Sequence, residues 1–115
     1  AQRLVRKLCP HCKLPHSANP VDCATLGVDP ATPPTLYTPN GCEHCNQSGY
    51  RGRTGIFELV TVDEVMQTLV HEGKGEQELE RHARLSSRSI RDDGRRRVLA
   101  GDTALAELVR VTRED

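Results

Sequence analysis

Aromatic side chains are scarce in this chain of 115 residues: they make up 3% of it, and there is no tryptophan. A core built on large rings is therefore excluded, and the core must be assembled from Val, Leu, Ile and Ala. A chain of this length fits one or at most two small domains. Small domains with thin cores often add a bound metal to reach stability. Such a metal can contribute about 10–16 kcal/mol of apparent binding free energy in small modules.

Further absences narrow the class of protein. The 16 basic and 16 acidic side chains cancel, whereas a general nucleic-acid-binding domain normally carries net positive charge. No apolar run approaches the roughly 20 residues that span a bilayer, and no secretory signal peptide opens the chain. The first residue is Ala1 and not methionine, and residues 1–8 read as the end of a preceding element. We therefore expect a C-terminal piece of a larger protein.

The residues also contain no catalytic constellation. There is no Ser/His/Asp arrangement, no paired-carboxylate setting and no open metal site. The phosphate-binding pattern G-x-x-x-x-G-K-[S/T] does not occur, and Gly73-Lys74-Gly75 is interpreted as a helix break. We expect no catalytic residue in this chain.

What the sequence does contain is two CxxC pairs, Cys9–Cys12 and Cys42–Cys45, separated by the 29 residues from Lys13 to Gly41. Each CxxC turn places two thiolates on one knuckle, and a second knuckle completes four-coordination. The spacing thus predicts a closed tetrahedral site, most simply for structural zinc. Four free thiols, or two disulfides, are the alternatives. Iron, as in rubredoxin, is a third, although rubredoxin-like cores are aromatic. The odd total of five cysteines with CxxC spacing indicates a reducing, cytosolic compartment.

Several other residues have more than one interpretation. His11 and His44 lie inside the knuckles, but four cysteines already complete the shell, so we expect both imidazoles to face solvent. Cys23 is expected to be a small buried apolar residue. For Arg51 and Arg53, contact with a phosphate, a salt bridge to the rest of a parent protein and ordinary solvation all remain open.

The N-terminal half is expected to hold short elements. Residues 2–8 are a helix end or a strand, and 35–38 and 53–60 are strands. A short helix is predicted between Asn19, its N-cap, and Gly27, its stop, with Pro20 at the first position.

The C-terminal half is expected to be helical. Thr61 and Glu64 form a capping box for a helix whose apolar stripe is Val62, Val65, Met66, Leu69 and Val70. Further helices are predicted at 76–85 and at 89–100, the latter with Ile90, Val98 and Leu99 inward and with Arg91, Arg95, Arg96 and Arg97 mostly outward. Gly101-Asp102-Thr103 is expected to stop that helix and to cap a last helix with the stripe Leu105, Leu108 and Val109. The predicted fold class is α+β, with a zinc-knuckle subdomain at 1–58 followed by a helical subdomain at 59–115.

Four stretches carry a resemblance to a known family: GCEHC, SGYRGRTGIFEL, IRDDGRRRVLAGDT and LAELVRVT. They resemble the C-terminal part of the secretion traffic ATPases, which assemble type II secretion systems and type IV pili. The type II members are the most similar, because both CxxC pairs and the IRDDG…VTRED ending occur together. The resemblance covers nearly the whole chain.

The resemblance implies a parent protein that is a homo-hexameric P-loop ATPase, cytoplasmic and peripheral to the bacterial inner membrane, which drives pseudopilus assembly. ATP and Mg²⁺ would bind upstream of this chain. The family's tetracysteine motif maps onto Cys9, Cys12, Cys42 and Cys45. The segment would be a structural or docking appendage that contacts the motor core, neighbouring subunits and inner-membrane platform proteins, with no nucleic acid expected. The alternative is a zinc-ribbon module that binds nucleic acid or a protein through Arg51, Arg53 and the arginines at 95–97.

Overall fold

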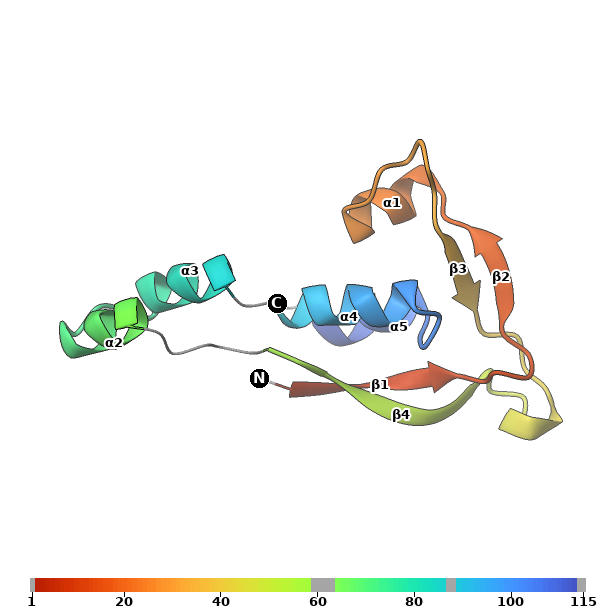
Figure 1. The fold of residues 1–115 in the computed structure, drawn as a ribbon. Helices are drawn as coiled ribbons and strands as arrows, with labels where there is room; N and C mark the ends of the chain where they lie inside the picture. Colours follow the sequence, from red (N-terminus) through yellow and green to blue (C-terminus); the bar gives the residue numbers. More distant parts are fainter. Residues whose placement is uncertain (1, 59–63, 87–88, 114–115) are drawn as a thin grey trace.

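The computed structural model describes residues 2–58, 64–86 and 89–113, and its fold is shown in Figure 1. The fold class is mixed α+β, as predicted: two small sheets and a cysteine cluster are followed by helices. The elements in chain order are β1 (Gln2–Leu8), β2 (Leu14–Ser17), α1 (Pro20–Leu26), β3 (Thr35–Thr38), the 3-10 turn η1 (Glu43–Cys45), β4 (Tyr50–Phe57), α2 (Glu64–His71), α3 (Glu76–Ser86), α4 (Ile90–Leu99) and α5 (Leu105–Thr112).

The strands form two antiparallel ribbons, β1 with β4 and β2 with β3. In the first ribbon Val5 lies opposite Thr54 and Leu8 opposite Tyr50. The first CxxC pair connects β1 to β2, and the second connects β3 to β4. Each knuckle therefore connects a strand of one ribbon to a strand of the other. Both knuckles consequently lie where the two ribbons meet (Figure 1).

Helix α1 begins and ends as its sequence predicts. The Asn19 side chain accepts a hydrogen bond from the backbone N–H of Asp22 (2.7 Å), and the Asp22 carboxylate accepts one from the backbone N–H of Asn19 (3.2 Å). Pro20 occupies the first turn, and Gly27 ends the helix at φ 70°, in the left-handed region that glycine tolerates best.

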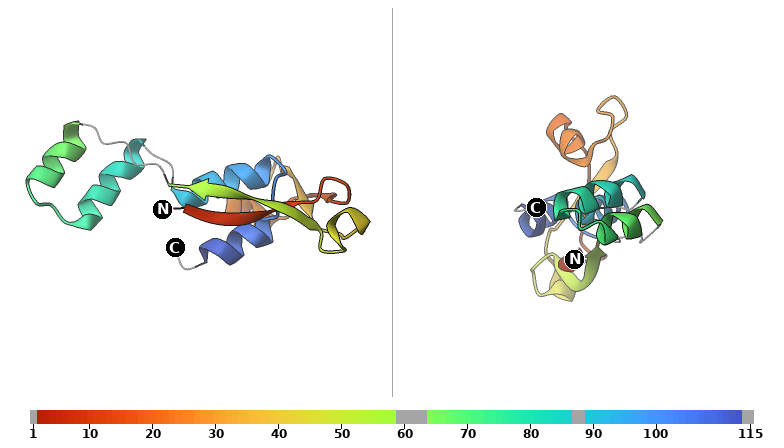
Figure 2. Two further views of the ribbon diagram at one scale, coloured as in Figure 1. Left: turned by 90° about the horizontal axis from the view of Figure 1, so that it is seen from below. Right: turned by 90° about the vertical axis from the view of Figure 1, so that its left-hand side faces the viewer.

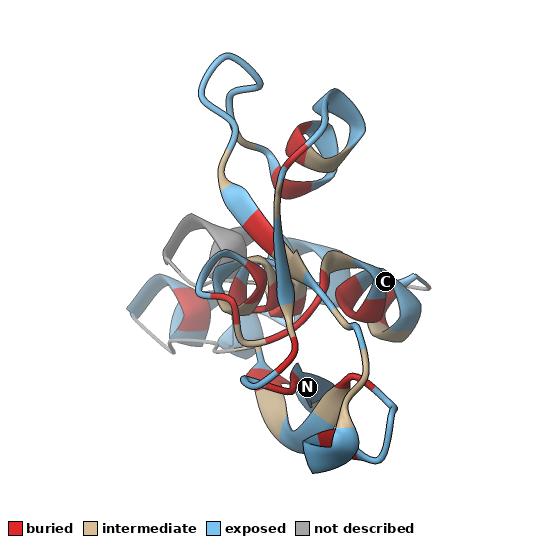
Figure 3. Ribbon diagram, turned by 90° about the vertical axis from the view of Figure 1, so that its right-hand side faces the viewer, coloured by how far each residue is buried: buried red, intermediate tan, exposed pale blue. Residues whose placement is uncertain are grey.

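One aliphatic core joins both halves of the chain. Helices α4 and α5 pack on the β1–β4 ribbon, and the buried segments converge there (Figure 3). The core residues are Val5, Ala18, Cys23, Leu26, Leu36, Ile56, Ile90, Val98 and Leu108. They come from both sides of residue 58, so the two expected subdomains share this core, and their division into separate units stays a prediction.

Helices α2 and α3 pack on each other and project beyond the end of the ribbon (Figure 2). Met66 is buried, but Val65 and Val70 are 53% and 59% exposed, so the predicted stripe is only partly covered. Gly73 follows α2 at φ 71°, as expected of a helix break. The predicted capping residue Thr61 and the stripe residue Val62 lie outside the described residues.

Three details of the prediction are wrong. Strand β4 begins at Tyr50 rather than Arg53, because pairing with Leu8 extends it. In α4, Leu99 is 42% exposed, since only Val98 of that pair faces the core. Val109 of α5 is likewise 46% exposed, so the inward stripe of that helix is narrower than expected.

The start of α5 also differs from the prediction. Its N-cap is Ala104, which makes no side-chain capping hydrogen bond. The hydroxyl of Thr103 instead donates to the backbone carbonyl of Arg6 at 2.7 Å, and a tertiary contact has therefore replaced the local cap. Within the described residues, no helix has the length and apolar character needed to cross a membrane.

Candidate metal centre

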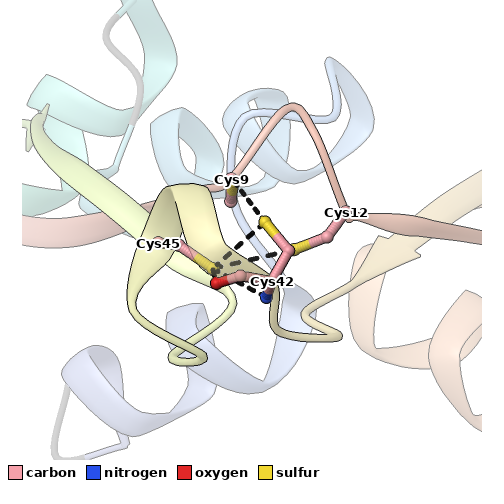
Figure 4. Close-up of side chains that lie close together, drawn as sticks. All are labelled: Cys9, Cys12, Cys42 and Cys45. Atoms are coloured by element: carbon pink, nitrogen blue, oxygen red, sulfur yellow. Dashed lines mark hydrogen bonds between the residues drawn. The ribbon is translucent and has the colours of Figure 1, made fainter.

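The four predicted cysteines lie together where the two ribbons meet (Figure 4). Their Sγ atoms all lie within 4.8 Å of one another. Cys42 Sγ lies 3.8 Å from Cys9 Sγ and 3.7 Å from Cys45 Sγ, and Cys12 Sγ lies 3.8 Å from Cys45 Sγ. Four sulfurs at about 2.3 Å from one central zinc would be separated by roughly 3.8 Å, whereas a disulfide joins sulfurs at about 2.05 Å. All five cysteines are free thiols, so the disulfide alternative is wrong and the geometry is compatible with a metal site.

Backbone hydrogen bonds at the end of β1 fix the position of the first knuckle. The N–H of Leu8 donates to the carbonyl of Asp102 (2.8 Å), and the N–H of Cys9 donates to that of Gly49 (3.0 Å). The turn closes when the N–H of Lys13 donates to the carbonyl of Cys9 (3.1 Å). Cys9, which is fully buried, is thereby tied to the second knuckle and to the loop before α5.

The second knuckle is a tight turn around η1. The N–H of Gln47 donates to the carbonyl of Cys42 at 2.8 Å. Asn46 and Gln47 both have positive φ angles, 53° and 64°, which is uncommon for residues other than glycine. The turn thus reverses the chain within a few residues and brings Cys45 back beside Cys42.

Backbone N–H groups point at two of the sulfurs. Cys45 Sγ accepts hydrogen bonds from the N–H groups of Cys42 (3.3 Å) and Gly49 (3.2 Å), and Cys12 Sγ accepts one from Gly41 (3.3 Å). Gly49 has a φ of 81°, and a Cβ there would collide with the Pro39 ring. Glycine at this position therefore allows the close approach that directs its N–H to the sulfur.

These contacts divide the thiols by acidity. Burial raises the pKa of Cys45, but the N–H donors of Cys42 and Gly49 outweigh burial and lower this pKa to about 6. Burial raises the pKa of the Cys42 thiol to about 11. Metals bind the thiolate form, so a metal at this site would find Cys45 the more acidic thiol of this pair and would have to displace the proton of Cys42.

The other singled-out residues lie outside this cluster of sulfurs. His11 and His44 are exposed, and their rings stack on each other at 4.0 Å between centroids. Cys23 is fully buried in the aliphatic core, as predicted. Arg51 and Arg53 are exposed on β4.

Sequence reasoning missed two buried carboxylates on the C-terminal helices. Asp93 accepts the backbone N–H of Phe57 at 2.9 Å and pairs with Arg96 at 2.7 Å. The Glu107 carboxylate forms salt bridges with Arg6 and Arg110. The signal for Asp93 was an acidic residue inside an arginine-rich helix, and no local pattern distinguishes Glu107 from a solvated residue.

Comparison of the sequence with known proteins identifies a family. A family model described as type II/IV secretion system protein matches residues 1–110. The chain belongs to this family. It is 61% identical over 115 residues to type II secretion system protein E of Pseudomonas aeruginosa, and 49% identical over 114 residues to type II secretion system ATPase E of Vibrio cholerae.

The match extends along this chain but covers only part of those relatives. The aligned region is 100% of this chain for the P. aeruginosa protein and 99% for the V. cholerae protein, and in each case 23% of the relative. A second P. aeruginosa relative, type II secretion system protein HxcR, is 42% identical over 115 residues. The chain thus corresponds to a segment of type II secretion proteins, and the segment contains the cysteine cluster.

Proposed function

We propose that this chain is the zinc-binding segment of an ATPase that powers type II protein secretion, with Cys9, Cys12, Cys42 and Cys45 as the zinc ligands. The observation that carries the proposal is the cluster of four Sγ atoms, all within 4.8 Å of one another and with three pairs at 3.7–3.8 Å, in a chain of this family. The V. cholerae relative, which matches 99% of this chain, is named an ATPase.

The role of the zinc in this proposal is structural. Four thiolates close the coordination shell, which leaves no position for a substrate or an activated water. Bound zinc would hold the two ribbons together at their meeting point, where the aliphatic core does not reach. His11 and His44 stay outside the shell in this assignment, stacked on each other at the surface.

ATP and Mg²⁺ would bind in the remaining part of the protein, a homo-hexameric motor at the cytoplasmic face of the inner membrane. ATP hydrolysis there would drive pseudopilus assembly through inner-membrane platform proteins. The outward face of the β1–β4 ribbon supports a contact with that motor core. Leu4 and Phe57 lie exposed on it, 53% and 43% respectively, and a two-stranded ribbon is only marginally stable without further packing.

A complementation experiment with the full-length protein tests this function. Cys42→Ser removes a ligand, and we expect it to abolish secretion of exoproteins through local misfolding while binding of a fluorescent ATP analogue persists. Cys23→Ala is the matched control, because Cys23 is buried away from the cluster and should leave secretion intact. A folded Cys42→Ser protein that secretes normally would contradict the proposal.

A further inference from the structure

The hairpin of α2 and α3 exposes apolar surface that nothing in its own fold covers. With 8 and 11 residues, its helices are shorter than the roughly 12–15 residues at which an isolated helix becomes marginally stable. On a helical projection, Val65 and Val70 mark the two edges of the apolar stripe on α2, with Met66 between them. Met66 is 4% exposed, whereas the two valines are more than half exposed. The hairpin therefore has room for another packing partner along this stripe.

The same hairpin carries a net negative charge. From Glu64 to Ser86 the chain contains five glutamates against one lysine and two arginines. Glu72, Glu76 and Glu78 are all exposed. A partner that covers the valines must therefore also accept negative charge, which calls for a basic surface with apolar residues.

Such a surface lies between α1, β3 and α5 of the main body. Two neighbouring cavities of about 430 Å³ and about 240 Å³ lie here, and Thr25 and Val109 line both; together they are called the groove. The larger end is lined by apolar residues that include Leu36 and Leu105, together with His16, Asp22 and Thr38. Val109 lies between the two ends and is 46% exposed.

The smaller end of the groove is basic. Arg91, Arg95 and Arg113 line it, and no acidic residue of the described chain does. Arg95 pairs with Asp92 at 3.0 Å, but both side chains remain more than a third exposed. Arg91 donates to a backbone carbonyl, that of Thr112, at 2.8 Å, which leaves its positive charge without compensation by that contact.

We propose that the α2–α3 hairpin of one copy docks into the groove between α1, β3 and α5 of a second copy. The glutamates of the hairpin would lie against the three arginines, and its exposed valines against Val109 and the apolar end. Within one molecule the hairpin packs on itself and projects away from this groove (Figures 1 and 2). The contact joins two different surfaces, so repetition generates a ring or an open chain of copies. The contact itself uses none of the four cysteines and no nucleotide.

Charge exchange in the full-length protein tests this contact. Glu76→Arg/Glu78→Arg reverses the hairpin, and Arg95→Glu/Arg113→Glu reverses the groove. We expect each double variant to weaken self-association about tenfold or more, measured by mass photometry on dilution. The four changes together should restore association, because the charges are again opposite. Asp29→Arg and Lys7→Glu reverse exposed charges elsewhere and serve as sign-matched controls.

Two results would overturn the proposal: double variants that associate like the wild type, or a folded quadruple variant that fails to recover. Should a reversal variant unfold, Glu76→Gln/Glu78→Gln replaces it, since neutral amides keep the helix and remove the attraction. Salt gives a variant-free measurement: association should weaken between about 50 and about 500 mM. Salt-independent association would argue against charge-driven docking.

Discussion

Glu107 binds Arg6 through both the backbone and the side chain of that residue. The Glu107 carboxylate accepts hydrogen bonds from the Arg6 backbone N–H (2.8 Å) and from its Nε and Nη2 atoms (3.1 Å each). Arg110 donates two more, from Nε at 2.8 Å and Nη2 at 3.0 Å. Because the Glu107 side chain is fully buried, this contact fixes α5 against β1, immediately before the first CxxC knuckle.

Glu107→Gln should therefore destabilise the protein. The glutamine side chain has the shape of glutamate but no charge, and its NH₂ group would face the N–H donors of Arg6 and Arg110. We therefore expect the free energy of unfolding to fall by about 2–3 kcal/mol. Urea denaturation measures the change. Arg110→Gln is the control: its side chain is 55% exposed, and its loss should cost only about 0–1 kcal/mol. Equal effects of the two changes would show that burial of Glu107 is not what matters.

The same carboxylate predicts how stability depends on pH. Burial raises the pKa of Glu107, but hydrogen bonds from Arg110 and Arg6 outweigh burial and lower this pKa from 4.5 to about 2. Since the folded-state pKa is the lower one, the stabilisation is complete above the unfolded-state value and is lost as the pH falls from 4.5 towards 2. The loss amounts to about 3 kcal/mol.

Comparison of the wild type with Glu107→Gln isolates this effect, because the two proteins share every other titratable group, including the cysteines. The stability difference between them should be constant from pH 7 to about pH 5 and should shrink below that. A difference that does not change down to about pH 2.5 would mean that Glu107 does not titrate in this way.

Gly94 allows α4 and α5 to approach each other. A Cβ at this position would overlap the Cδ1 atom of Leu108. Alanine is the better helix former by up to about 1 kcal/mol, but we expect overpacking to win, with a net loss of about 1–2 kcal/mol for Gly94→Ala. Gly75→Ala is the control, since no atom lies within 4 Å of its added Cβ. A stabilised Gly94→Ala protein in thermal denaturation would show that the helices can separate at little cost.

Features that depend on neighbouring residues were predictable from sequence. The capping box of Asn19 and Asp22, with Gly27 at the other end, specifies α1 within a stretch of nine residues. The cysteine cluster was predictable for a related reason: each CxxC turn is local, and four thiols leave few ways to satisfy one metal. The helix at 89–100 was also predicted, and the structure adds that Ser89 caps it locally.

Features that depend on residues distant in the sequence could not be predicted from it. Pairing of β1 with β4 joins Leu8 to Tyr50, and no local pattern specifies it. Thr103 has the side chain of a good N-cap, yet it donates to the carbonyl of Arg6 on the edge of β1. Glu107 reads as a solvated residue of an amphipathic helix until the edge of β1 is placed against it. In both cases a backbone group of β1 gains a partner that the sequence alone does not reveal.

Metal content is the most direct test of the central claim. The purified protein, kept under reducing conditions, would be analysed for zinc and iron per chain, alongside Cys45→Ser and Cys23→Ala. We predict close to one zinc per chain in the wild type and in Cys23→Ala, and loss of zinc in Cys45→Ser. Iron in place of zinc would indicate an electron carrier. A folded wild-type protein with neither metal would contradict the assignment of the four cysteines as a structural zinc site.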